Sequence, residues 1–127
     1  MMFPGKLIGF VPTSDAERAR AFYEGVLDMR FVEDDGFALV MDAGGTMIRI
    51  VRVGEFVPAR FTLTGWEVAG IEGVVRSMSA KGVVFERYGL PGQGDDGVWS
   101  APGRAKVAWF KDPDGNVLSI SEHADRT

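Results

Sequence analysis

The segment Trp109–Glu122 reads WFKDPDGNVLSISE and decides the fold of this chain. Apolar residues lead into Asp112, and residues of alternating character follow Asn116, which predicts a strand on each side of a tight turn. Pro113 suits the first central position of such a turn because its φ is fixed, and Gly115 can take a positive φ. We therefore expect a β-hairpin here.

A weaker copy of this hairpin lies earlier in the chain. Residues 39–51 read LVMDAGGTMIRIV. When the two segments are aligned, Asp42 matches Asp112 and Gly45 matches Gly115. The chain therefore contains one structural unit twice.

The composition limits the class of protein. The chain has 127 residues, 46% hydrophobic and 25% charged, which suits one globular domain and is too short for two ordinary ones. Its net charge of −4, with acids and bases interspersed, argues against nucleic acid as a partner. There is no cysteine, so disulfides and thiolate-bound zinc are excluded. No segment has the pattern of a signal peptide or a membrane span, so we expect a soluble, cytoplasmic protein without a membrane partner.

The predicted elements follow the same order twice. Within a single domain, 1–127, the first unit covers about residues 5–53, a linker about 54–60, and the second unit about 61–122. Each unit has the order β-α-β-β-β, which makes the fold class α+β. Two units are expected to pack together because neither could bury the apolar face of its helix alone.

Two amphipathic helices are expected, at about residues 15–27 and 70–81, where apolar residues recur at spacings of three and four. Ser14 and Glu17 form a capping-box pattern at the start of the first helix, and Gly82 suits the end of the second. The expected strands cover about residues 6–13, 29–33, 37–42, 46–53, 61–68, 83–87, 104–111 and 116–121.

A long connection interrupts the second unit. The segment Tyr88–Gly103 has 16 residues, of which five are Gly and two are Pro. Connections of this length in a small domain are more often functional or mobile than accidental. Tyr88, Trp99 and Trp109 flank it and could stack on a planar ligand.

These features resemble the vicinal oxygen chelate superfamily, which includes glyoxalase I, bleomycin-resistance proteins and extradiol dioxygenases. The resemblance rests on TSDAERARAFYEGVL at residues 13–27, on FKDPDGNVLSIS at residues 110–121 and on the repeated unit, and it covers essentially the whole chain. It implies two curled sheets that form an open, U-shaped barrel with the helices outside. It also implies a small molecule or metal in the cleft, and a homodimer, which in some members completes the cleft.

The resemblance assigns metal-ligand positions in the superfamily's metal enzymes, where His and Glu are usual. In this chain those positions hold Ile8, Arg49, Leu63 and Ser119. None of these side chains is a usual ligand of a divalent metal, so we expect no metal and no other cofactor. The alternative is a site improvised from Glu67, Glu122 and His123, which would require three misplaced groups to converge.

By strand alternation, the residues on the same sheet face as Ile8, Arg49, Leu63 and Ser119 are mostly apolar, with a few polar groups. Trp66 is expected on the opposite face. Arg49 could bind a carboxylate, phenolate or enolate oxygen, and in an empty apolar site it must be paired because it cannot lose its proton. We expect Glu67 as that partner; the alternative is an Arg49 that faces solvent or pairs with a nearby acid. The expected ligand-binding residues are Phe10, Met47, Arg49, Leu63, Glu67, Trp99, Ser119 and Ser121.

Three functions stay open. The first, our working interpretation, is a metal-free protein of the bleomycin-resistance kind that binds a small, partly apolar and anionic or aromatic molecule. The second is a lyase, isomerase or dioxygenase with an atypical active site, in which Arg49 and Glu67 act as electrostatic and acid–base groups. In the third, side chains fill the cleft and the domain serves only in association. No catalytic residue is assigned.

Overall fold

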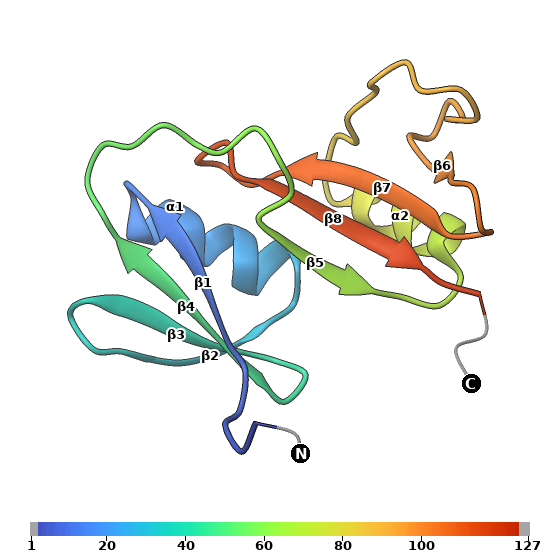
Figure 1. The fold of residues 1–127 in the computed structure, drawn as a ribbon. Helices are drawn as coiled ribbons and strands as arrows, with labels where there is room; N and C mark the ends of the chain where they lie inside the picture. The colour runs from blue at the N-terminus through green and yellow to red at the C-terminus, as the bar shows by residue number, and fades with distance from the viewer. Residues whose placement is uncertain (1–2, 125–127) are drawn as a thin grey trace. The chain divides into compact units, whose positions relative to one another are not determined.

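The computed structural model describes residues 3–124, and the chain divides into two compact units, Met1–Val57 and Pro58–Thr127. The fold class is α+β, as predicted: each unit has a four-stranded mixed sheet and one helical segment (Figure 1). The boundary between the units lies inside the expected linker 54–60.

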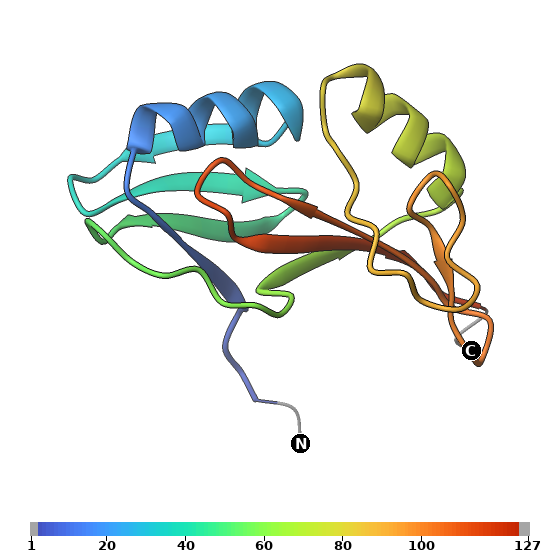
Figure 2. The same ribbon diagram turned by 90° about the horizontal axis from the view of Figure 1, so that it is seen from above.

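The first unit has the sheet order β1-β4-β3-β2, with β1 parallel to β4 and the other neighbours antiparallel. The helical segment lies over one face of this sheet (Figure 2), and the core between them includes the buried residues Val11, Ala19, Tyr23 and Ile50. The elements are β1 (Ile8–Thr13), α1 (Ala16–Arg20), its π-helical continuation η1 (Ala21–Val26), β2 (Arg30–Asp34), β3 (Ala38–Ala43) and β4 (Thr46–Arg52).

The first helix differs from the prediction in two details. Its N-cap is Asp15 rather than Ser14, because Asp15 is the extended residue before the helix and its carboxylate accepts a hydrogen bond from the Arg18 backbone N–H at 3.1 Å. Its second half widens into π turns, in which the Leu27 N–H bonds the Phe22 carbonyl at 3.0 Å.

The second unit repeats this plan with the sheet order β5-β8-β7-β6, in which β5 is parallel to β8. Its helix covers one face of the sheet (Figure 2), with Ile71, Val75, Phe110 and Leu118 buried in the core. The elements are β5 (Thr64–Glu67), α2 (Ile71–Ala80), β6 (Trp99–Ser100), β7 (Lys106–Lys111) and β8 (Val117–Glu122).

The hairpin predicted at residues 109–122 is confirmed. The buried carboxylate of Asp112 accepts hydrogen bonds from the Asp114 and Asn116 backbone N–H groups, each at 2.9 Å, and from the Asn116 side-chain amide at 2.8 Å. Gly115 has a φ of +89°, as the turn requires. The repeated hairpin in the first unit has a corresponding bond, from the Gly45 N–H to the Asp42 carboxylate at 2.7 Å.

The second helix receives its N-terminal cap from the last strand. Gly70 occupies the cap position and has no side chain to offer, and the Ile71 N–H bonds the Glu122 carboxylate at 2.8 Å. At the other end, Gly82 has a φ of +95°, and the Val83 N–H bonds the Met78 carbonyl at 3.1 Å, as predicted for a C-terminal glycine.

The predicted strand at residues 83–87 does not form. Only Phe85 bridges to β7, opposite Phe110, with one further backbone bond from the Glu86 N–H to the Trp109 carbonyl at 2.8 Å. The connection 88–103 folds back instead, so that Trp99 pairs with Val107 further along β7. Two short segments therefore share an edge that one strand was expected to fill.

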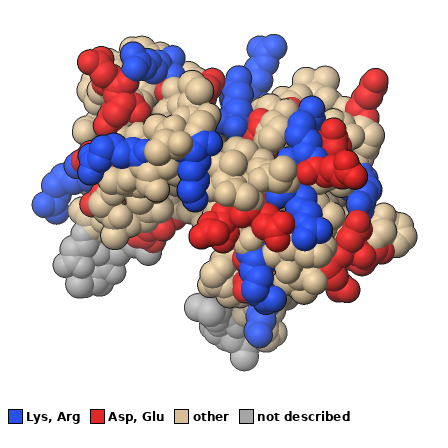
Figure 3. All heavy atoms as spheres, turned by 180° about the vertical axis from the view of Figure 1, so that it is seen from behind, with Lys and Arg blue, Asp and Glu red and all other residues tan. Residues whose placement is uncertain are grey.

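Charge is distributed without segregation on the face that Figure 3 shows, where basic and acidic side chains are interspersed. Among residues 3–124, no helix has both the length and the apolarity that a membrane crossing needs.

Candidate functional site

Each sheet has a helix-distant face, by which we mean the face turned away from the helix of the same unit. In the first unit, Phe10 and Arg49 lie opposite each other on this face, as do Ile8 and Met47. Phe10 is 57% exposed and Met47 40%, whereas their neighbours on the helix side are buried. The face therefore presents apolar side chains around one arginine.

Arg49 has a carboxylate partner within its own unit. Its guanidinium lies 2.6 Å from the Asp35 carboxylate, and its side chain is 25% exposed. Asp35 also accepts hydrogen bonds from the Phe37 and Ala38 N–H groups, and the Arg49 bond is the main reason why its pKa is lowered. Within the first unit Arg49 thus pairs with a nearby acid, which is the alternative to the expected Glu67 partner. The Arg49–Glu67 contact itself stays a prediction.

In the second unit, the helix-distant face carries residues of three strands in register. Gly65 lies opposite Ser119 and Glu67 opposite Ser121, while Ser119 lies opposite Trp109 on β7. A Cβ added to Gly65 would come within 2.5 Å of the Ser119 hydroxyl oxygen, so Gly65 leaves room for this hydroxyl. Leu63, just before β5, is held beside β8 by a hydrogen bond from its N–H to the Val117 carbonyl at 2.8 Å. It therefore continues the line of β5 residues on this face.

Three rings gather on this face, and we call Tyr88, Trp99 and Trp109 the aromatic cluster. Tyr88 packs edge-on against Trp109 with ring centroids 5.4 Å apart, and Trp99 is tilted by 31° against Trp109 at 5.8 Å. Both indole N–H groups are bonded, Trp109 to the Thr62 hydroxyl at 3.1 Å and Trp99 to the Pro91 carbonyl at 3.0 Å. The orientation of the rings is thus fixed by hydrogen bonds as well as packing. Trp66 instead stacks on the buried Phe110, on the helix side as predicted.

The long connection that carries two of these rings is held by the side chain of Gln93. Its amide nitrogen donates to the Glu86 and Gly97 carbonyls at 3.0 and 2.9 Å, and its amide oxygen accepts from the Tyr88 N–H at 2.9 Å. These bonds tie the start of the loop to its middle, at Gly97. Sequence reasoning passed over Gln93, since nothing in a local pattern shows that one amide bridges distant backbone groups.

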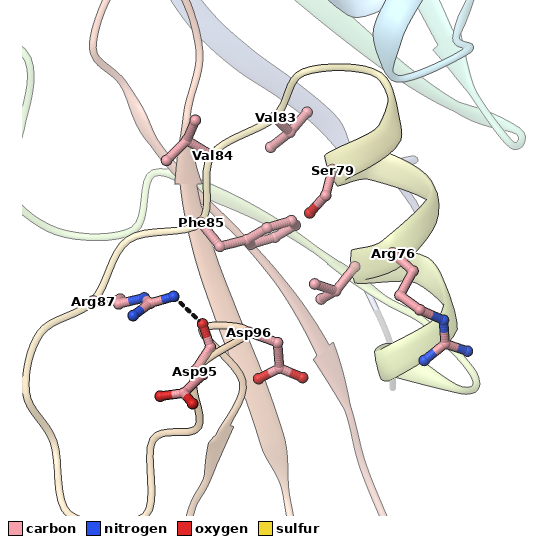
Figure 4. Close-up of a pocket in the computed structure, with 9 residues that line it drawn as sticks. Arg76, Ser79, Val83, Val84, Phe85, Arg87, Asp95 and Asp96 are labelled. Carbon is pink, nitrogen blue, oxygen red and sulfur yellow. Dashed lines mark hydrogen bonds between the residues drawn. The ribbon is translucent and has the colours of Figure 1, made fainter.

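The described residues of the second unit line hollows beside the sheet and beside α2. One, of about 450 Å³, is lined by Pro58, Ala59, Arg60, Tyr88, Lys111, Gly115 and Val117. The other, of about 480 Å³, lies beside α2 (Figure 4), where Arg87 donates a hydrogen bond to the backbone carbonyl of Asp95. The first hollow includes a ring of the aromatic cluster, and the second does not.

A comparison with protein-family models matches residues 8–120 to the Glyoxalase/Bleomycin resistance protein/Dioxygenase superfamily. The chain belongs to this superfamily. The match confirms the resemblance stated from the sequence. A search of curated proteins found no significant match.

Solved structures of superfamily proteins share the fold. A glyoxalase family protein from Bacillus anthracis is 18% identical with a TM-score of 0.73, and 98% of each chain is covered. A lactoylglutathione lyase from Agrobacterium tumefaciens is 16% identical with a TM-score of 0.70, covering 94% of this chain and 93% of its own. A glyoxalase/bleomycin resistance protein/dioxygenase from Alicyclobacillus acidocaldarius is 13% identical with a TM-score of 0.69, covering 96% and 93%. At these identities the likeness shows the fold alone.

The residues present do not suit the divalent metal of the superfamily's metal enzymes. The positions for its ligands hold Ile8, Arg49, Leu63 and Ser119, and the part of the chain at residues 3–124 has no group of three or more His, Asp or Glu that could hold a metal. Two residues of the alternative metal site, Glu122 and His123, have other contacts. Glu122 caps α2, and the His123 ring lies 2.9 Å from the Ser121 hydroxyl.

Proposed function

We propose that this superfamily member binds a small, partly apolar aromatic molecule, without a metal, on the helix-distant face of its second unit. The observation that carries the proposal is the aromatic cluster of Tyr88, Trp99 and Trp109. Rings on a sheet surface offer a planar ligand a large apolar contact, and stacked or edge-on aromatic pairs add to the energy of burial alone.

The surroundings of the cluster support this role. Tyr88 is 48% exposed and Leu63 37%, so apolar surface remains available for contact on the face. Ser119 and Ser121 lie in register with Trp109 and Val107. Ser119 is buried, whereas the half-buried Ser121 can orient a polar substituent if its hydroxyl exchanges the His123 ring for the ligand. Because the loop is held by Gln93, little conformational entropy is lost when a ligand fixes it further.

The first unit contributes a separate set of proposed contacts, Phe10, Met47 and Arg49. Arg49 would exchange Asp35 for an acidic group of the ligand, since both offer an anionic oxygen to the guanidinium. Arg49→Met keeps most of the apolar stem and removes the charge. If a ligand binds this variant as tightly as the parent, the anion-binding role of Arg49 is wrong. A homodimer, as in many superfamily members, is part of the proposal.

The test uses N-phenylnaphthylamine, a neutral aromatic probe, together with a panel of neutral aromatic fragments, by isothermal titration calorimetry. We expect Trp99→Leu and Trp109→Leu each to weaken binding about tenfold. Trp66→Phe, which alters the third tryptophan on the helix side, should leave binding unchanged. Circular dichroism identifies variants that remain folded. The proposal fails if no neutral aromatic binds, or if folded Trp99 and Trp109 variants bind like the parent.

A further inference from the structure

The hollow of about 450 Å³ lies on the same sheet face as the aromatic cluster, at the hairpin end of β7 and β8. Its floor includes Val117, which is 7% exposed and lies opposite Lys111 in the β7–β8 register. Pro58 borders it so closely that a Cβ on Gly115 would come within 3.2 Å of the proline ring. The floor and walls are thus largely apolar.

The charges that line this hollow have one sign. Arg60 and Lys111 are its ionisable lining residues besides Tyr88, and no carboxylate belongs to the lining. The Lys111 side chain is 51% exposed, and among residues 3–124 its ion pair is a long one, with Glu86 at 3.6 Å. Arg60 makes no ion pair with the described residues of the chain. In a protein with a net charge of −4, two weakly paired cations beside one hollow form a local site for an anion.

Tyr88 connects this hollow to the aromatic cluster. Its ring contacts Trp109 on one side, at a centroid distance of 5.4 Å, and it lines the hollow on the other. Burial, with a smaller contribution from the charge of Glu86, raises the pKa of the Tyr88 phenol. A phenol is protonated at neutral pH even without this shift, so the Tyr88 hydroxyl can donate a hydrogen bond to an anion.

From this geometry we propose that the hollow is a subsite for the acidic substituent of the ligand, a carboxylate or sulfonate held between Arg60 and Lys111 while the aromatic body stacks on the cluster. This inference rests on the proposed function and adds the ligand class, an aromatic anion. It is a second anion contact, separate from the one proposed for Arg49 in the first unit, and it is tested without Arg49.

The experiment compares two probes that share one aromatic body. Anilinonaphthalene sulfonate carries an acidic group and N-phenylnaphthylamine lacks it; both are titrated by calorimetry into the folded full chain at low and at physiological ionic strength. We expect the sulfonate to bind more tightly, and its advantage to shrink as salt rises. Arg60→Gln and Lys111→Gln should each weaken sulfonate binding about threefold to fivefold and leave the neutral probe unchanged.

Arg76→Gln serves as the matched control, because it removes the same charge from the exposed side of α2, beside the other hollow. It should leave both affinities as they are. If both probes bind equally in a tryptophan-dependent manner, or if Arg76→Gln has the same effect as Arg60→Gln, the subsite is overturned and the aromatic site stands. If neither probe depends on Trp99 or Trp109, the proposed function itself has failed.

Discussion

The two units share one plan and differ in what they place on the helix-distant face. In the first unit a cation, Arg49, is paired with Asp35 in the β2–β3 turn. The edge strand of this sheet, β2, has five residues. In the second unit the matching edge of the sheet is divided between Phe85 and a two-residue strand, β6. Tyr88 on the loop between them and Trp99 in β6 add aromatic rings to this face. Both units thus have the same hairpin and helix, and they differ in the residues at the edge of the sheet.

The largest expected difference concerns the two equivalent hairpin aspartates. Asp112→Ala removes the acceptor of three hydrogen bonds in a buried turn, and we expect it to lower the free energy of unfolding by about 3 kcal/mol. Asp42→Ala removes one backbone bond and a long contact with Arg30, and should cost about 1 kcal/mol. Urea denaturation of both variants measures the comparison. Equal losses in the free energy of unfolding would mean that the Asp112 hydrogen bonds stabilise the fold no more than the Asp42 bond does.

The next difference concerns the helix caps. Asp15 caps α1 from the adjacent residue, whereas Glu122 caps α2 from the end of β8. We expect Asp15→Ala and Glu122→Ala each to cost about 1 kcal/mol of stability. Glu122→Gln keeps an acceptor and should recover part of the loss. Amide hydrogen exchange separates the two, since only the Glu122 variants should expose the first turn of α2. Unchanged exchange there would contradict the assigned cap.

A smaller effect is expected in acid, and it should appear in the first unit. The bond from Arg52 lowers the pKa of Asp34 from 3.8 to about 2. A carboxylate with a depressed pKa stabilises the folded state above the unfolded value and loses that contribution as the pH falls toward the folded value. The stability should therefore decline between pH 3.8 and about 2. Carbon-detected NMR titration should show the Asp34 midpoint near 2, rising toward 3.8 in Arg52→Gln. An identical midpoint in the variant would exclude the pair as the cause.

No effect is expected from divalent metals in either unit. Elemental analysis of protein purified without a metal-affinity column should give far less than one metal per chain. Zn²⁺, Ni²⁺ or Mn²⁺ should leave the midpoint of thermal unfolding unchanged, because the described residues do not bring three suitable donors together. Near-stoichiometric metal, or a metal-dependent rise in that midpoint, would contradict the conclusion that Ile8, Leu63 and Ser119 leave the ligand positions without metal donors.

Local patterns were the part of the molecule that the sequence predicted well. The turn at Asp112, the repeat at Asp42 and the glycine after α2 all depend on residues close together in the chain, so their spacing carries the information. Strand alternation likewise placed Phe10 and Arg49 on one face.

Contacts between distant residues were the part that spacing could not supply. The Glu122 cap joins residues 51 positions apart, and the edge of β7 is shared because the loop folds back on a glutamine side chain. The Arg49–Asp35 pair follows from the path of the β2–β3 turn, which brings Asp35 to a strand 14 residues away. The hollow with Arg60 and Lys111 combines the linker with the hairpin, and neither segment alone indicates an anion site.

The cap that Glu122 gives to α2 also affects the order in which the chain can fold during synthesis. The first unit contains its own helix cap in Asp15, so α1 can be capped as soon as its residues emerge from the ribosome. The helix α2 begins after Gly70, and its N-terminus stays without this carboxylate until residue 122 has been made and β8 has docked. Translation should therefore leave α2 without this cap for the time needed to add the residues between Gly70 and Glu122, whereas α1 has its cap from the start.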